Sequence, residues 1–364
     1  FWLKHVRIFS HCASASATPA SMVPRVVKLW QGWRTAHEEH HDKKAEASEV
    51  RLFSSLVPPT PEEAAALADG LELAGRSLEP PRFHTTDWTL GQCFTALDDP
   101  DRALEPWEPP ECLLPRCKQD QASATSGGLH GPKQQQRRAK AQDLKVSAGR
   151  GRSQNGSFAR VVDGVLSEKE CAELVAQVNA KGFTPALLNI GGGQQQLIPD
   201  VRDGHRVIVD SAPLAARLFE ELRPFLPETL EDGSQLQGLN ERLRFLCYTP
   251  GQVFEPHYDG CYTRPYGNSR AGEYSHVTVQ LYLHDVPDAH GGATTFNPGS
   301  SGALPCQPRV GRALLFTQDL YHEGSLLSRG LKYTVRTEAM YKPCRPQVSV
   351  KGGFPRLPFL RNGA

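Results

Sequence analysis

The chain has 364 residues, which is room for one large domain or two ordinary ones, and its formal net charge at pH 7 is +1. Because the charges nearly balance, the composition does not predict a nucleic-acid or acidic-membrane partner for the molecule as a whole. Hydrophobic residues make up 39% of the chain, while glycine and proline number 32 and 29, so we expect a compact part joined to a loose part.

Two further features of the composition limit the class of protein. No uncharged apolar stretch of about 18 residues occurs, and a transmembrane helix is therefore not predicted. The nine cysteines are scattered without a Cys-x-x-Cys pair, which favours reduced, buried thiols over a disulfide scaffold.

Residues 1–37 contain no Asp or Glu but carry several Lys and Arg residues among many Ser and Ala. This composition suits an organelle transit segment and equally a solvated basic tail, so the compartment stays open. The chain begins at Phe1 and not at Met, and we expect the natural N-terminus to lie upstream.

The run His37-Glu38-Glu39-His40-His41 matches the His-Glu-x-x-His pattern of zinc proteases. That motif needs a helix beside a cleft and a third ligand, whereas this copy lies in a charged and poorly patterned stretch. We therefore interpret it as a chance match.

Residues 57–157 are rich in Pro, Gly, Gln and charged residues. Glu62 and Glu63 open a short Ala-rich patch that is compatible with a helix, and residues 131–152 are strongly basic. Such a composition buries too little apolar surface to offset the entropy of ordering, so we expect residues 1–157 to be low-complexity, largely disordered and dispensable for activity. A nuclear-localisation or nucleic-acid patch is the alternative for the basic segment.

Helical patterning begins after residue 158. The sequence from Ser167 to Glu170 is typical of a capping box, in which Ser167 accepts a hydrogen bond from a helical N–H and Glu170 reaches back. Apolar residues then recur at helical spacing until Gly182, which can end the helix. A second helix is predicted over residues 211–222.

Further along the chain the period changes to two. Apolar and polar residues alternate in residues 243–248, 276–283 and 332–336, which predicts an antiparallel β fold. We therefore expect a domain over residues 158–345 in which helices come first and a β sandwich or barrel follows, with residues 346–364 as a tail.

The β-rich part contains a candidate pair of metal ligands, His257 and Asp259. Along an extended strand, residues i and i+2 point the same way, so this imidazole and this carboxylate can reach one cation. A third ligand from a distant strand would complete a set of two histidines and one carboxylate. That set leaves three coordination positions open, which iron(II) needs in order to bind a cosubstrate and dioxygen together.

His322 is the candidate third ligand, because it follows the apolar strand 313–316 and precedes a cation, Lys332, that could hold a dicarboxylate. A His-x-Asp pair alone is unspecific, and a core histidine satisfied by a carboxylate is its ordinary interpretation. His322 follows the pair, and the Gly-x-Lys sequence of residues 330–332 follows His322. This order favours a metal site.

With these residues in place, the sequence resembles the catalytic domain of the prolyl 4-hydroxylase type within the 2-oxoglutarate and iron(II) dioxygenases. The resemblance covers about residues 158–343, roughly half of the chain. The matching pieces are residues 243–259, Val279-Gln-Leu-Tyr-Leu283, Gly291-Gly-Ala-Thr-Thr-Phe296, Gly311-Arg-Ala-Leu-Leu-Phe316, His322-Glu-Gly324 and Gly330-Leu-Lys-Tyr333.

The resemblance implies a mainly β fold with flanking helices, in which a double-stranded β-helix (jelly-roll) core is preceded by packed helices. It implies iron(II) on His257, Asp259 and His322. It also implies a 2-oxoglutarate pocket with Lys332, Tyr248 and Thr294, and Arg336, on the same strand face as Lys332, is a candidate second anion contact. The implied reaction converts 2-oxoglutarate and O2 to succinate and CO2 and hydroxylates an unactivated C–H bond, with ascorbate restoring the iron.

The sequence departs from the peptide-prolyl members in one place. They tend to carry a Trp just beyond the lysine strand, whereas residues 333–341 read Tyr-Thr-Val-Arg-Thr-Glu-Ala-Met-Tyr. The substrate therefore stays open between a peptidyl proline and a free amino acid or other small molecule. A catalytically silent jelly-roll binding module is a further alternative, but it would have no need of the three ligands together with Lys332. The oligomeric state is not predicted.

Overall fold

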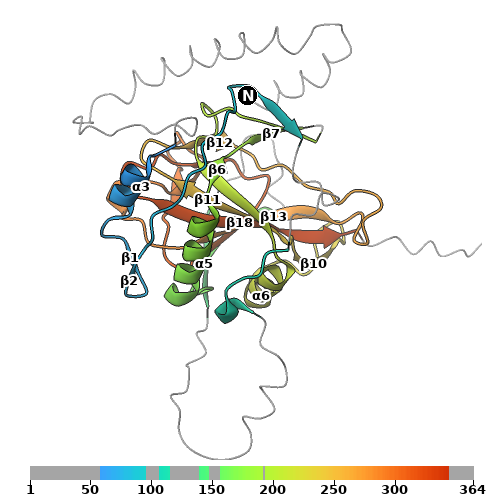
Figure 1. The fold of residues 1–364 in the computed structure, drawn as a ribbon. Helices are drawn as coiled ribbons and strands as arrows, with labels where there is room; N and C mark the ends of the chain where they lie inside the picture. Colours follow the sequence, from blue (N-terminus) through green and yellow to red (C-terminus); the bar gives the residue numbers. More distant parts are fainter. Residues whose placement is uncertain (1–57, 96–105, 115–138, 147–155, 192, 344–364) are drawn as a thin grey trace, which may run out of the picture.

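The computed structural model describes residues 58–95, 106–114, 139–146, 156–191 and 193–343, and Figure 1 shows their arrangement. An antiparallel sheet of nine strands, the major sheet, runs through the molecule. Eight strands follow the order β4-β5-β16-β13-β18-β11-β9-β6, and β10 pairs with β18 from outside this path. Their bounds are β4 Lys140–Leu144, β5 Ala159–Asp163, β16 Ala313–Thr317, β13 Tyr274–Tyr282, β18 Lys332–Lys342, β11 Arg242–Tyr248, β9 His205–Asp210, β6 Thr184–Pro185 and β10 Gln235–Leu239.

A second antiparallel sheet, the minor sheet, has four strands in the order β12-β17-β14-β15. These strands are β12 Phe254–His257, β17 His322–Gly324, β14 Thr294–Phe296 and β15 Leu304–Cys306. The two sheets pack face to face, because Phe296 and Cys306 share a buried cluster with Leu314 and Phe316 of β16. This pair of facing sheets is the predicted double-stranded β-helix (jelly-roll) core.

Two helices cover the outer face of the major sheet (Figure 1): α5 Glu168–Lys181 and α6 Ala212–Leu222. Their apolar stripes join the largest buried cluster, to which the major sheet contributes Phe245, Val279 and Val335. In strand β18, alternate side chains lie on opposite faces of the major sheet and have different roles. Val335 faces the helices, whereas Lys332 and Arg336 face the minor sheet and line a cavity there.

The helix boundaries follow from the predicted capping residues. The Glu170 backbone N–H donates to Ser167 Oγ at 3.2 Å, and the Ser167 N–H donates to Glu170 Oε2 at 2.7 Å. Gly182 ends α5 with a positive φ of 87°, a conformation that favours glycine. Helix α6 begins after Ser211, whose hydroxyl accepts from the Leu214 N–H. Both helix predictions are confirmed.

The remaining elements are short. They are α3 Pro61–Ala68, the pair β1 Glu72–Leu73 and β2 Arg76–Ser77, and a three-stranded sheet of β3 Cys93–Thr95, β8 Gln194–Gln196 and β7 Leu188–Gly191. Three single-turn 3-10 helices also lie in the part of the chain that the structure describes: η2 Glu111–Leu113, η4 Arg223–Phe225 and η5 Asp288–His290. None of the helices in the described ranges has the length and apolar character to cross a bilayer.

The structure corrects part of one expectation, that residues 1–157 are largely disordered. Three segments of that region fold onto the domain, namely residues 58–95, 106–114 and 139–146. Their apolar residues are few, but they are placed where they reach the core: Leu73 and Leu113 are 5% and 0% exposed within the main cluster. The average composition of a segment does not reveal these few buried residues. Burying a few large side chains can order a segment whose other residues are polar.

The segments are also held by rings and by backbone pairing. The Trp107 ring lies edge-on to Phe245 with centroids 5.7 Å apart, and the Trp107 N–H donates to the Asp210 carbonyl. Strand β4, inside the basic segment 131–152 that was expected to be disordered, extends the major sheet by pairing with β5. The candidate transit segment, the His37–His41 run and the tail after residue 343 lie outside the described residues.

Leu113 provides a test of this attachment. Leu113→Ala should leave a cavity under the 106–114 segment and lower the free energy of unfolding by about 2–5 kcal/mol in urea titrations. The neighbouring Leu114, which is 38% exposed, is the control: Leu114→Ala should change the free energy by no more than about 0.5 kcal/mol. Equal stability of Leu113→Ala and wild type would mean that the segment does not belong to the folded domain.

Candidate active site

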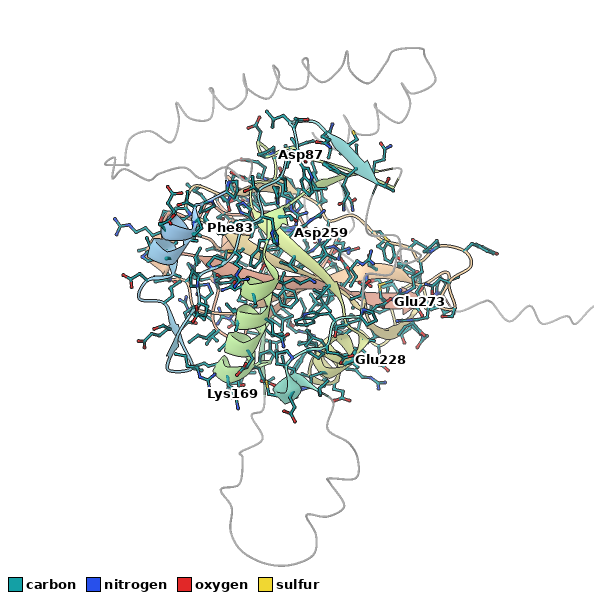
Figure 2. All side chains as sticks on the ribbon, in the orientation of Figure 1. Phe83, Asp87, Lys169, Glu228, Asp259 and Glu273 are labelled. Carbon is teal, nitrogen blue, oxygen red and sulfur yellow. The ribbon has the colours of Figure 1, made fainter. Side chains whose placement is uncertain are left out.

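The three candidate metal ligands converge at one end of the minor sheet. His257 is the last residue of β12 and His322 the first of β17, and the two residues are paired opposite each other in the antiparallel register. Asp259 follows two positions after His257, its side chain is 5% exposed, and Figure 2 labels it near the middle of the view. One ligand atom from each of the three residues lies within 4.8 Å of the others.

Each histidine is oriented by a backbone carbonyl. His257 Nδ1 lies 2.7 Å from the Glu255 carbonyl oxygen, and His322 Nδ1 lies 3.0 Å from the Leu320 carbonyl oxygen. Since a carbonyl can only accept, both Nδ1 atoms carry the proton and both Nε2 atoms keep a lone pair for a metal. Burial lowers the pKa of His322 to about 4, so this imidazole is neutral at pH 7, as metal binding requires.

Both carboxylate oxygens of Asp259 are held by neighbours on the major sheet. Arg336 Nη2 lies 2.8 Å from Oδ1, and the Thr278 hydroxyl donates to Oδ2 at 2.5 Å. Burial alone would raise the pKa of Asp259, but the positive charge of Arg336, together with the two histidines, holds it well below its usual range. The aspartate is therefore ionised and fixed in orientation.

The geometry fits a single divalent ion. The Nε2 atoms of His257 and His322 lie 3.7 and 3.9 Å from the nearer oxygens of Asp259. Three donors at cis positions around one ion, each about 2.1 Å from it, lie about 3.0 Å apart, so the three donors, which lie within 4.8 Å of one another, would move closer by up to about 1.8 Å on binding it. Two neutral imidazoles and one carboxylate are the donors of a facial iron(II) site with open positions.

The metal-ligand cluster opens into a cavity that also contains Lys332, Tyr248 and Thr294. Lys332 is 3% exposed, and its Nζ lies 5.0 Å from the centroid of the Tyr248 ring. Within the described ranges no carboxylate pairs with this ammonium group. Burial lowers the pKa of Lys332 to about 8. A buried cation of this kind is costly unless an anion joins it, which makes it the natural receptor for a carboxylate ligand.

Two more predicted residues line the same cavity. Thr294 Oγ1 accepts from both Gln280 Nε2 and the Tyr282 hydroxyl at 2.8 Å, so its own proton can point to a ligand. Burial raises the pKa of Tyr248, so its hydroxyl stays protonated and can donate. A Cβ on Gly204 would lie 2.9 Å from Tyr248 Cε1, so the tyrosine ring packs directly on this glycine.

Arg336 also lines the cavity, but the structure gives it a different neighbour from the one expected. The sequence suggested that it contacts the cosubstrate, whereas its guanidinium is paired with Asp259. Of the two cations on this strand face, Lys332 is the one without an acidic partner among the described residues.

Sequence reasoning missed one residue of this cavity, Arg202. It is 7% exposed, its guanidinium lies 4.8 Å from the Phe254 ring centroid, and its Nη1 donates to the Leu187 carbonyl at 3.2 Å. Its Nε is buried without a hydrogen-bond partner. In the sequence it lies in a polar stretch between a short strand and β9, and periodicity gives no sign that its side chain turns inward.

The comparisons with known proteins agree with this geometry. Residues 243–337 match the family model described as the 2OG-Fe(II) oxygenase superfamily. This part of the chain belongs to that superfamily. The chain is also similar to Prolyl 4-hydroxylase 5 of Arabidopsis thaliana, with 28% identity over 153 residues. That match covers 41% of the chain and 48% of the relative, so the chain spans about half the length of the curated relative.

Two solved structures give further similarities. The viral collagen prolyl hydroxylase of Paramecium Bursaria Chlorella virus-1, in its 2OG complex, is 19% identical with a TM-score of 0.37, covering 51% of this chain and 97% of that one. The prolyl hydroxylase of Trichoplax adhaerens, in complex with a hypoxia inducible factor peptide fragment, is 17% identical with a TM-score of 0.38, covering 51% and 83%.

Proposed function

We propose that the chain is a 2-oxoglutarate- and iron(II)-dependent dioxygenase that hydroxylates a C–H bond of a prolyl residue. One observation carries the proposal: a two-histidine, one-carboxylate cluster opens into the same cavity as a buried lysine that has no acidic partner among the described residues. Iron(II), when bound, supplies the O2 chemistry that converts 2-oxoglutarate to succinate and CO2.

The residues of the chain have separate parts in this proposal. His257, Asp259 and His322 hold the metal, and Lys332 receives the distal carboxylate of 2-oxoglutarate. Tyr248 and Thr294 donate hydrogen bonds to the same ligand. Ascorbate, the reductant that often serves this family, is the proposed means of restoring the iron.

Two other functions compete with this one. A hydroxylase of a free amino acid or other small molecule is favoured by residues 333–341, which contain no tryptophan where the peptide-prolyl members tend to carry one. A silent binding module would not retain a buried lysine without an acidic partner, because that charge costs stability in the absence of a ligand.

Turnover of 2-oxoglutarate tests the proposal. The purified chain, loaded with iron(II) under anaerobic conditions and then exposed to O2, should form succinate from 2-oxoglutarate even without a substrate. Proline-containing peptides should raise that rate. If no succinate forms under any of these conditions, the proposed dioxygenase function is wrong.

The pKa of Lys332 adds a pH dependence. The ammonium form is the one that binds a carboxylate, and it is lost as the pH rises through about 8. Affinity for 2-oxoglutarate should therefore fall about tenfold between pH 7 and pH 9, measured by calorimetry at constant metal concentration. In Lys332→Arg the side chain stays charged over this range, so the fall should disappear. A pH-independent affinity in the wild type would contradict the assigned role of Lys332.

A further inference from the structure

A segment from the N-terminal part of the chain lies against the residues that support Tyr248. This segment, residues 82–95, is called the strap, and backbone pairing holds both of its ends. At one end the His84 N–H donates to the Phe183 carbonyl and the Phe183 N–H donates to the Arg82 carbonyl, both at 2.8 Å. At the other end β3 pairs with β8. Because Phe183 directly precedes β6, the strap is fixed at this edge of the major sheet.

Phe83, labelled in Figure 2, is the strap residue that packs against the main buried cluster. Its ring centroid lies 4.6 Å from that of His205, and the two ring planes are 60° apart. His205 is 1% exposed and is paired opposite Cys247 in the register of β9 and β11. Phe83 therefore covers a buried histidine that lies beside the end of β11, where Tyr248 is found.

Gln252 connects His205 to the backbone next to Tyr248. The Thr249 N–H donates to Gln252 Oε1 at 2.9 Å, so the other amide atom, Nε2, is the one that lies 3.4 Å from His205 Nδ1. Since Nε2 can only donate, Nδ1 accepts, and the imidazole is neutral with its proton on its own Nε2. Burial lowers the pKa of His205 to about 3, which agrees with this state.

The backbone at His205 also sets the position of the Tyr248 ring. A Cβ on Gly204, the preceding residue, would lie 2.9 Å from Tyr248 Cε1, so the ring rests directly on this glycine. Tyr248 is also paired with Lys332 in the register of β11 and β18. A shift of residues 204–205 would therefore move the phenol relative to the cavity, and a misplacement of about 1 Å can weaken a directed contact strongly.

We propose that Phe83 and Gln252 are positioning residues that act through His205 on Tyr248, so that the strap is required for full affinity for 2-oxoglutarate. This role rests on the proposed function, in which the Tyr248 hydroxyl donates to that ligand. Phe83 holds the imidazole from outside the sheet, and Gln252 holds it from the turn that follows β11. The strap then contributes to the active site, in contrast to the expectation that residues 1–157 are dispensable.

A purely structural role for Phe83 would give a different result from a positioning role. A cavity anywhere in the core lowers stability, but it does not by itself change the affinity for a ligand of one site. Phe83 and Gln252 hold the same imidazole from different segments of the chain. Their effects on 2-oxoglutarate affinity should therefore not add, whereas independent effects add.

The test uses the full chain loaded with iron(II) without oxygen. Calorimetry measures 2-oxoglutarate affinity and iron(II) affinity, and urea titration measures the free energy of unfolding. The variants are Phe83→Ala, Gln252→Leu and the double variant. Phe83→Leu, which fills more of the space beside His205, is measured in parallel.

Two matched controls separate the strap contact from general damage. Phe94→Ala is the same change in the same strap, but the Phe94 ring packs on Trp88, with centroids 4.6 Å apart. Leu113→Ala removes a side chain that is 0% exposed in a different N-terminal segment. Both controls should bind 2-oxoglutarate within about twofold of wild type, although Leu113→Ala is less stable.

Phe83→Ala and Gln252→Leu should each weaken 2-oxoglutarate binding about tenfold, while iron(II) affinity changes by less than about twofold. The double variant should also lose about tenfold, because the second change removes support that is already lost. Phe83→Leu should show a smaller loss than Phe83→Ala.

Four results would overturn the positioning role while leaving the dioxygenase function intact. They are wild-type affinity in Phe83→Ala, equal losses of iron(II) and 2-oxoglutarate affinity, a loss of about a hundredfold in the double variant, and a tenfold loss in either control. If the wild type itself bound no 2-oxoglutarate, both proposals would be overturned.

Discussion

Lys332→Ala is expected to lose 2-oxoglutarate affinity by roughly 30-fold to several thousand-fold, because removing one partner of a buried charged contact costs about 2–5 kcal/mol. Lys332 is 3% exposed and has no acidic partner in the described part of the chain, so its charge is available to the cosubstrate. Affinity for iron(II) should change far less, since Lys332 is not a ligand. Calorimetry with each ligand in turn measures both quantities.

Two variants make this result specific. Lys332→Arg should recover only part of the affinity, because the guanidinium is larger and differently shaped than an ammonium group. Arg336→Ala should weaken metal binding more than cosubstrate binding, because Arg336 pairs with Asp259. If Lys332→Ala bound 2-oxoglutarate normally and Arg336→Ala lost the affinity, the cosubstrate cation would be Arg336.

Asp259→Ala should reduce succinate formation by more than about 100-fold, which is the upper end of the loss seen when only a partner of a metal ligand is removed. The fold should persist, because the sheets are held together by apolar residues such as Phe296 and Phe316 and not by the metal. Circular dichroism and thermal unfolding check the fold, and succinate assays check turnover.

The longer Asp259→Glu is the matched control for charge. It keeps the carboxylate but moves it away from Thr278 and Arg336, so turnover should fall here too. Normal turnover in Asp259→Glu would mean that the geometry at this position does not matter, and normal turnover in Asp259→Ala would remove this residue from the metal site.

Much of the fold could be predicted because local signals and tertiary structure agree in this part of the chain. The Ser167 capping box and Gly182 define α5, and the alternation in residues 332–336 assigns Val335 to the core and Lys332 to the cavity. The spacing of His257 and Asp259 likewise predicted that both side chains reach one ion, although β12 ends at His257 and Asp259 lies just beyond it.

The rest of the fold and of the site depends on contacts between residues that are far apart in the sequence. A local sequence pattern does not predict such contacts. Leu113 and Trp107 are single apolar residues in polar surroundings, and only the folded core shows that they are anchors. Arg202 turns inward because Phe254, far along the chain, offers a ring to stack on. The ion pair between Arg336 and Asp259 was not predicted for the same reason. The alternation of the strand predicts on which face the Arg336 side chain lies, but not which carboxylate it contacts.

The most direct measurement of the central claim is the iron(II) content of the chain, purified without oxygen, for wild type and His322→Ala in parallel with 2-oxoglutarate decarboxylation. The wild type should bind one iron(II) per chain and release succinate, whereas His322→Ala should bind little iron(II) and release none while keeping the wild-type circular dichroism spectrum. A wild type that binds no iron(II), or a His322→Ala protein that turns over normally, would contradict the dioxygenase assignment.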